Sequence, residues 1–218
     1  MRTLPVFLTY LGITLMAVWP LPSLGACTIN ITAGNDTSTC NSGAAPGFTD
    51  TAGNNTLNLS GSGSLNGDVT LGAGNDLVDI NGATAAINGM LHQGDGANTF
   101  RLTLGAVTGS ITQGDGVDLV QINGGHAGAI IQGGGIDSFV MRDGTVESLA
   151  QGDGHDTFVM SGGTIKGAFE DGDQALMTGG TIGRVDMKLD NNVFDTRGGT
   201  IVGNLVTGLG RDTILVSG

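Results

Sequence analysis

The stretch Gly-Asp-Gly-Val-Asp-Leu-Val-Gln-Ile, residues 114–122, decides the fold, because close copies of it recur along the chain. Each copy places a glycine-rich phrase before an acidic or amide residue, and apolar residues alternate after it. The clearest other copies are GAGNDLVDI (72–80), GDGANTFRL (94–102), GGGIDSFVM (133–141), GDGHDTFVM (152–160) and GLGRDTILV (208–216). A recurring period of this kind is the signature of a repeat architecture.

One Asp or Asn anchors each copy, and we call these ten anchors the Asx column. They are Asp36, Asn55, Asp76, Asn98, Asp118, Asp137, Asp156, Asp173, Asn192 and Asp212. The step from one anchor to the next varies between 17 and 22 residues. All ten positions carry Asp or Asn, which is far beyond chance for a chain of this composition.

The residues after each anchor predict a short strand. The second and fourth positions are mostly apolar, as in Val120 and Ile122, whereas the third is polar in the early copies, as in Gln121. Such alternation, bounded by glycine, is typical of a strand with one buried face. Gly-Thr-Ile phrases at residues 163–165 and 180–182 indicate a second strand in each repeat.

Short strands joined by glycine-rich corners in about 19 residues fit one coil of a parallel β-helix. The sequence therefore predicts an all-β, right-handed parallel β-helix, or β-solenoid, of about ten coils of ~19–20 residues. It spans residues 27–218, with residues 27–50 as an N-terminal cap. The 41 glycines argue against a helical fold, since each costs about 1 kcal/mol inside a helix. The regular apolar phasing argues against disorder.

The N-terminus has the layout of a secretory signal peptide, residues 1–26. Met1 and Arg2 give a positive start, residues 4–19 are apolar, and cleavage is expected near Ala26. The apolar run is shorter than the roughly 20 residues that a transmembrane helix needs. We therefore expect the chain to be exported.

Two cysteines, Cys27 and Cys40, follow the signal peptide. In an exported protein an even number of cysteines favours a disulfide. The phrase Leu-Gly-Ala-Cys at residues 24–27 also resembles a bacterial lipobox, in which Cys27 would be a lipid anchor. The disulfide is the favoured of these two interpretations.

The net charge of −12, with only eight Lys and Arg residues, argues against a nucleic-acid partner, because phosphate neutralisation needs clustered basic residues. Docking on an anionic membrane through a basic patch is disfavoured for the same reason. An acidic surface is compatible with solubility or with a cation.

Stacked coils turn each aligned position into a ladder of like side chains. Gln93, Gln113, Gln132 and Gln151 form one such ladder, which we interpret as structural because stacked amides can hydrogen-bond along the rod. The consecutive anchors Asp118, Asp137, Asp156 and Asp173 form another. Two carboxylates at strand spacing repel by about 3–4 kcal/mol at an effective dielectric of 20.

Two alternative arrangements of these side chains would relieve this repulsion. Asx side chains that hydrogen-bond their own turns explain all ten anchors without any metal. Alternatively, Asp118, Asp137, Asp156 and Asp173 bind calcium, since the phrase at residues 133–140 resembles the nonapeptide of the RTX family. In that family the nonapeptide occurs twice per turn, whereas here it occurs once. We favour the Asx turns and expect no other cofactor.

No catalytic constellation is recognisable, so we expect the chain not to be an enzyme. His92, His126 and His155 lie in separate repeats without metal-ligand spacing, and a nucleophile motif is absent. A polysaccharide-active β-helix remains an alternative function, although the mature part lacks the Trp and Tyr residues such grooves use.

The signal peptide, the early cysteine pair and the Gly-Gly-Thr-Ile phrases at residues 162–165 and 179–182 together resemble the passenger region of bacterial autotransporters, which use type V secretion. The resemblance implies a β-helical stalk on the outer membrane or cell surface, often adhesive, carried there by a C-terminal barrel. The chain stops in mid-repeat at Gly218, so we expect a further barrel segment in the full-length protein.

One outward stripe is the candidate contact surface. The third position after the anchor becomes apolar in later copies, namely at Val140, Val159, Leu176 and Leu215, and an apolar stripe on a surface suits a protein contact. We therefore expect a structural or adhesive surface protein that contacts a host or neighbouring cell surface or matrix. An RTX-like calcium-binding module is the main alternative.

Overall fold

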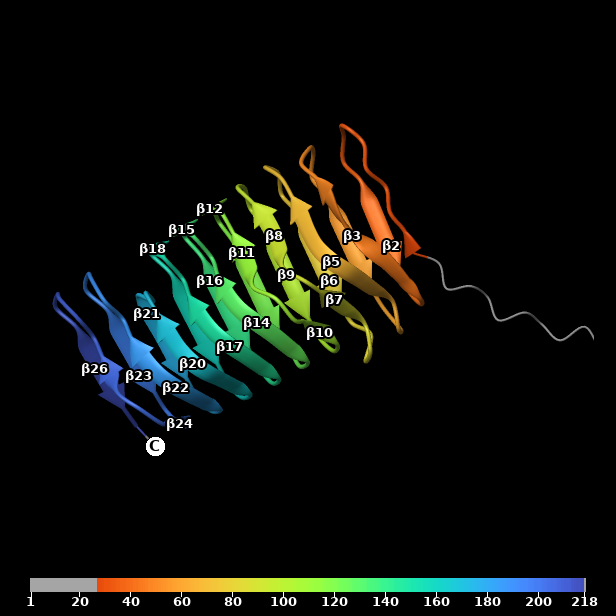
Figure 1. Cartoon of the computed structure of the whole chain (residues 1–218). Coiled ribbons are helices and arrows are strands. Elements are labelled where there is room, and N and C mark those ends of the chain that lie inside the picture. The colour runs from red at the N-terminus through yellow and green to blue at the C-terminus, as the bar shows by residue number, and fades with distance from the viewer. Residues whose placement is uncertain (1–26, 218) are drawn as a thin grey trace, which may run out of the picture.

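The structure is a computed structural model that describes residues 27–217; the predicted signal peptide lies outside the described residues. Within them the chain forms 26 strands and no helix, so nothing in this part resembles a helical membrane span. The strands stack as a rod of successive coils from the N-terminal to the C-terminal end (Figure 1). The expected all-β solenoid is confirmed, and it makes about nine turns.

Sheet A takes one strand from each coil, stacked in chain order. Its members are β1 (Cys27–Thr28), β2 (Thr37–Cys40), β4 (Thr56–Leu59), β6 (Leu77–Ile80), β9 (Thr99–Leu102), β13 (Leu119–Ile122), β16 (Ser138–Met141), β19 (Thr157–Met160), β21 (Gln174–Met177), β23 (Val193–Thr196) and β26 (Thr213–Val216). At every step from β2 onward, the residue after one anchor pairs in parallel with the residue after the next. The repeat alignment predicted from the sequence is therefore confirmed throughout sheet A.

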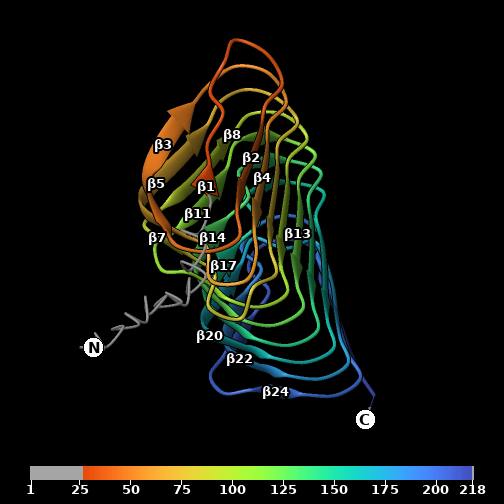
Figure 2. The same ribbon diagram turned by 90° about the vertical axis from the view of Figure 1, so that its right-hand side faces the viewer.

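Sheet B holds the second strand of each coil and faces sheet A across the core (Figure 2). Its members are β3 (Ala44–Asp50), β5 (Ser64–Leu71), β7 (Ala86–Asn88), β8 (Leu91–Gly94), β10 (Ala106–Val107), β11 (Ile111–Gln113), β14 (His126–Ile131), β17 (Thr145–Ala150), β20 (Thr164–Glu170), β22 (Thr181–Asp186), β24 (Thr200–Ile201) and β25 (Leu205–Val206). The predicted second strand is thus present, although a break after residues 88, 107 and 201 divides it in three coils.

A short third sheet joins the glycine-rich corners of three successive coils, and glycine allows these corners to approach one another. Sheet C contains β12 (Asp115–Gly116), β15 (Gly134–Gly135) and β18 (Asp153–Gly154). Gly135 has a φ of 144°, and a Cβ atom there would overlap the carbonyl oxygen of Gly116 in the coil before. Only glycine lets these corners approach at strand spacing.

The core is a series of thin layers between sheets A and B. Side chains at the second and fourth positions after the anchor are at most 3% exposed from Leu57 to Phe194. Phe139 and Phe158 stack nearly parallel with centroids 5.5 Å apart, and Phe169 from β20 stacks on Phe158 at 4.1 Å. Ala175 follows Phe158 in this column, and its small side chain leaves room for Phe169.

The two ends of the stack differ. At the N-terminal end β1 runs antiparallel to β2, and Cys27 and Ile29 pack against the core. At the other end all four residues of β26 are exposed, and no later strand of the described residues pairs with it. The N-terminal cap therefore closes one end of the hydrophobic core.

Replacing Phe158 by Ala should lower the free energy of unfolding by about 3–5 kcal/mol, because it removes a fully buried ring that stacks on two others. Urea unfolding followed by circular dichroism measures the change. Val159→Ala alters the neighbouring outward side chain and should cost much less. Equal losses for the two variants would contradict the layered core.

Candidate functional site

The Asx column is a hydrogen-bond ladder that runs along the rod with a single gap among the described residues. The backbone N–H of Asn98 donates to Oδ1 of Asp118 at 2.8 Å, and the N–H of Asp118 donates to Oδ1 of Asp137 at 2.8 Å. The N–H of Asp137 donates in the same way to Asp156. The same bond links the other successive anchors, except between Asp173 and Asn192.

Our expectation that each anchor's oxygen bonds its own turn was therefore wrong for most of the column. The strands stack so closely that the side chain of one coil reaches the backbone of the coil before it. Local bonds are made by the Asn amides and by Asp36. Nδ2 of Asn98 donates to the carbonyl oxygen of Gly94, and Nδ2 of Asn192 donates to that of Leu189, both at 2.8 Å. Oδ2 of Asp36 accepts from the backbone N–H of Thr32 at 2.7 Å.

Four of the seven Asp anchors keep one buried oxygen without a hydrogen-bond partner. Oδ2 of Asp76, Asp118, Asp137 and Asp156 accepts no hydrogen bond, and these residues are at most 1% exposed. Burial raises the pKa of Asp118 and Asp137 to about 6 and the pKa of Asp156 to about 7, against an ordinary value of 3.8. Burial likewise raises the pKa of Asp76 to about 6.

The structure aligns the four candidate calcium ligands but does not assemble them into a metal centre. Asp118, Asp137, Asp156 and Asp173 each give one oxygen to a backbone N–H. Across residues 27–217 no group of three or more His, Cys, Asp or Glu side chains is placed to hold a metal ion. The geometry is that of a ladder that satisfies backbone donors.

The predicted Gln ladder forms as two pairs. Nε2 of Gln113 donates to Oε1 of Gln93 at 3.1 Å, and Nε2 of Gln151 donates to Oε1 of Gln132 at 3.3 Å. Gln93, Gln132 and Gln151 also donate to carbonyl oxygens of the adjoining strands. All four side chains are buried, in keeping with a structural role.

The apolar stripe is continuous over three of its four expected residues. Val140 pairs with Val159, and Val159 pairs with Leu176, on the outer face of sheet A. Asp195 then stands between Leu176 and Leu215. Leu215 is therefore separated from the run, and we use "apolar stripe" below for Val140, Val159 and Leu176. Asp195 occupies the third position after Asn192, so the repeat alignment itself could have located it.

A shallow groove of about 280 Å³ borders this stripe. Val159 and Leu176 line it, and Asp195 and Arg197 stand at its end, with Nη2 of Arg197 2.6 Å from Oδ2 of Asp195. Sequence reasoning did not anticipate the groove, because its depth depends on how neighbouring strands stack. The groove places polar hydrogen-bonding groups directly beside an apolar run.

A larger hollow of about 490 Å³ lies on sheet B, between β20, β22 and residues 202–204. Its basic residues are already paired within the described chain: Lys166 with Glu147, and Arg184 with Glu170 and Asp186. Salt-bridged, exposed side chains offer little free charge to a ligand. Arg197 in the groove is paired in the same way with Asp195, so free charge does not distinguish the two hollows. The groove is the stronger candidate because it borders the apolar stripe.

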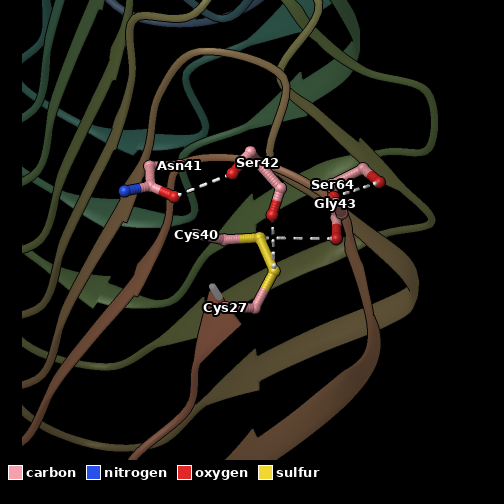
Figure 3. The surroundings of a disulfide bond; sticks show 6 residues. All are labelled: Cys27, Cys40, Asn41, Ser42, Gly43 and Ser64. Carbon is pink, nitrogen blue, oxygen red and sulfur yellow. Dashed lines mark hydrogen bonds between the residues drawn. A yellow bond between two sulfur atoms is a disulfide. The ribbon is translucent and has the colours of Figure 1, made fainter. Parts of the chain in front are cut away.

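The predicted cysteine pair closes the N-terminal cap. Cys27 and Cys40 lie opposite each other in the antiparallel β1–β2 pair, and their sulfur atoms are joined (Figure 3). Cys40 is fully buried at the position where later coils place Leu59 or Ile80. Lipidation of Cys27 would need this same sulfur, so the geometry favours the disulfide.

Comparison with protein-family models, with curated proteins and with solved structures gives no match. The class of the protein, a β-solenoid, follows from its own fold.

Replacing both cysteines by Ala should lower the free energy of unfolding by up to about 3 kcal/mol, because the disulfide closes a short loop in the unfolded chain. Urea unfolding of the oxidised wild type and of the double variant measures the loss. A reducing agent should bring the wild type to the stability of the variant. Full stability in the double variant would contradict a stabilising role for the cap.

Proposed function

We propose that this chain is the exported β-helical passenger, or stalk, of a bacterial surface autotransporter, with a structural or adhesive role and no enzymatic activity. The β-solenoid fold supports the proposal, because stacked coils make a long, stiff spacer with extended faces. The sequence pattern of residues 1–26 supports export to the cell surface or outer membrane.

The single observation that carries the adhesive role is the apolar stripe. Val140, Val159 and Leu176 follow one another on the outer face of sheet A, where earlier coils carry polar residues such as Asn58 and Gln121. The core does not need these side chains, because they point away from it. Their change from polar to apolar along the rod supports the proposal of a local contact surface.

The net charge of the chain limits the class of partner that fits the stripe. With a net charge of −12, the rod attracts basic surfaces and repels acidic ones at moderate ionic strength. The partner that fits is a cell-surface or matrix protein that presents an apolar segment flanked by basic residues. The apolar segment would lie along the stripe and the groove beside it.

Changing Val140 and Val159 to Lys should weaken attachment to cells or matrix protein by about tenfold or more, because it removes apolar contacts and adds charges that repel a basic partner. Surface plasmon resonance on immobilised matrix proteins measures the affinity. Circular dichroism should remain that of the wild type, since both residues lie outside the core.

The matched control is Thr39→Lys with Asn58→Lys, which adds the same charges to two paired residues at the same strand position, in coils distant from the stripe. This control should bind like the wild type. Equal binding by the stripe variant and the wild type would remove the stripe as the contact surface, and equal loss in both variants would point to general charge instead.

A further inference from the structure

We propose that in mild acid Asp76, Asp118, Asp137 and Asp156 are neutral carboxylic acids in the folded rod and ionised in the unfolded chain, so that the solenoid takes up protons as it folds and loses stability toward alkaline pH. Each acid uses its proton to act as the hydrogen-bond donor that Asn provides at other anchors. The proposal concerns the interior of the rod and is independent of the contact surface.

The interchange of Asp and Asn along one column is the first observation. Both side chains accept the backbone N–H of the preceding coil, as Asp118 does from Asn98 and as Asn98 does from Asp76. Asn98 then donates from Nδ2 to its own turn. A carboxylate at this position has no proton to donate, whereas a carboxylic acid has one and matches the amide in shape.

The balance of donors and acceptors in the interior is the second observation. The buried side-chain atoms without a partner in residues 27–217 are oxygens throughout: Asp76 Oδ2, Gln113 Oε1, Asp118 Oδ2, Asp137 Oδ2, Gln151 Oε1, Asp156 Oδ2 and Asn192 Oδ1. The described interior thus has surplus acceptors. An unsatisfied buried group costs about 1–3 kcal/mol, and more when it is charged. One proton on each Asp converts a surplus acceptor into a donor.

The charged groups that face these four residues increase the cost of ionisation, because nearly all of them are acidic. They are Asp50 beside Asp76, Asp95 beside Asp118, Asp118 beside Asp137, and Asp137 and Asp173 with His155 beside Asp156. His155 is largely exposed, and its Nδ1 lies 3.8 Å from Oδ1 of Asp173. Burial and carboxylate neighbours therefore both favour the neutral acid.

The direction of the pH dependence follows from these environments. Burial raises the pKa of Asp76, Asp118 and Asp137 from 3.8 to about 6, and that of Asp156 to about 7. Between pH 3.8 and about pH 6 to 7, the folded rod binds more protons than the unfolded chain. The stabilisation is fully present below pH 3.8 and is lost as the pH rises through 6 to 7.

Thermal unfolding of the full chain, followed by circular dichroism in metal-free buffer from about pH 4 to pH 8, tests the proposal. The midpoint should fall by several degrees as the pH rises. Asp137→Asn should raise the midpoint at the alkaline end by about 2–4 °C, and the triple variant D118N/D137N/D156N should remove most of the pH dependence. Infrared spectra of the folded wild type at about pH 5, which lies between the ordinary pKa and the raised one, should show a protonated carboxyl band that the triple variant lacks.

Two matched variants make the result decisive. Asn98→Asp should add pH dependence and lower the alkaline midpoint, whereas Asp153→Asn changes an exposed carboxylate and should leave the profile unchanged.

A wild-type midpoint that rises with pH, or an Asp137→Asn variant that is less stable than the wild type at the alkaline end, overturns the proposal. Calcium chloride that raises the alkaline midpoint of the wild type but not of the triple variant also overturns it, because a cation would then neutralise the column. If the variants do not fold, absence of the infrared band in the wild type rejects the proposal.

Discussion

The bond from a backbone N–H at one anchor to the side-chain oxygen of the next anchor recurs at eight of the nine steps and ties successive coils together. Its length varies only from 2.6 to 3.1 Å along the column, although the coils contain between 17 and 22 residues. The anchor fixes where each strand of sheet A begins, so that extra residues are accommodated in the loops and at the breaks of sheet B. A solenoid can therefore vary its coil length and keep its core in register.

Because the coils stack at one strand spacing, equivalent residues of successive coils lie in the same kind of environment. Glycine recurs where a Cβ atom would overlap the previous corner, as at Gly116 and Gly135. Phenyl rings recur where they can stack, as at Phe139 and Phe158. The outward positions escape this constraint, because solvent lies beyond them. Binding properties can thus change from one coil to the next, from Gln121 to Val140, without disturbing the interior.

The sequence was sufficient to predict the fold, the register of sheet A and the core residues of that sheet, because these follow from the alternation of apolar residues after a recognisable anchor. It was not sufficient for the direction of the anchor bonds, because a side chain that reaches the previous coil cannot be distinguished by spacing from one that bonds its own turn. The absence of the bond between Asp173 and Asn192 could not be predicted from the sequence either. Two residues near it, Asp171 and Asp190, have positive φ values of 54° and 74°, a local backbone feature that no repeat alignment contains.

The direction of the anchor bonds also gives the rod a growth polarity. Apart from that of Asp173, each anchor N–H that has a following anchor donates to a residue 17 to 22 positions later, so a chain folded only up to one coil leaves that coil's donor without its acceptor. Adding the next coil satisfies that donor and buries the exposed layer in one step. The disulfide-linked cap at Cys27 and Cys40 covers the opposite end of the stack. Each coil thus presents to the next one the same backbone donor and the same apolar layer.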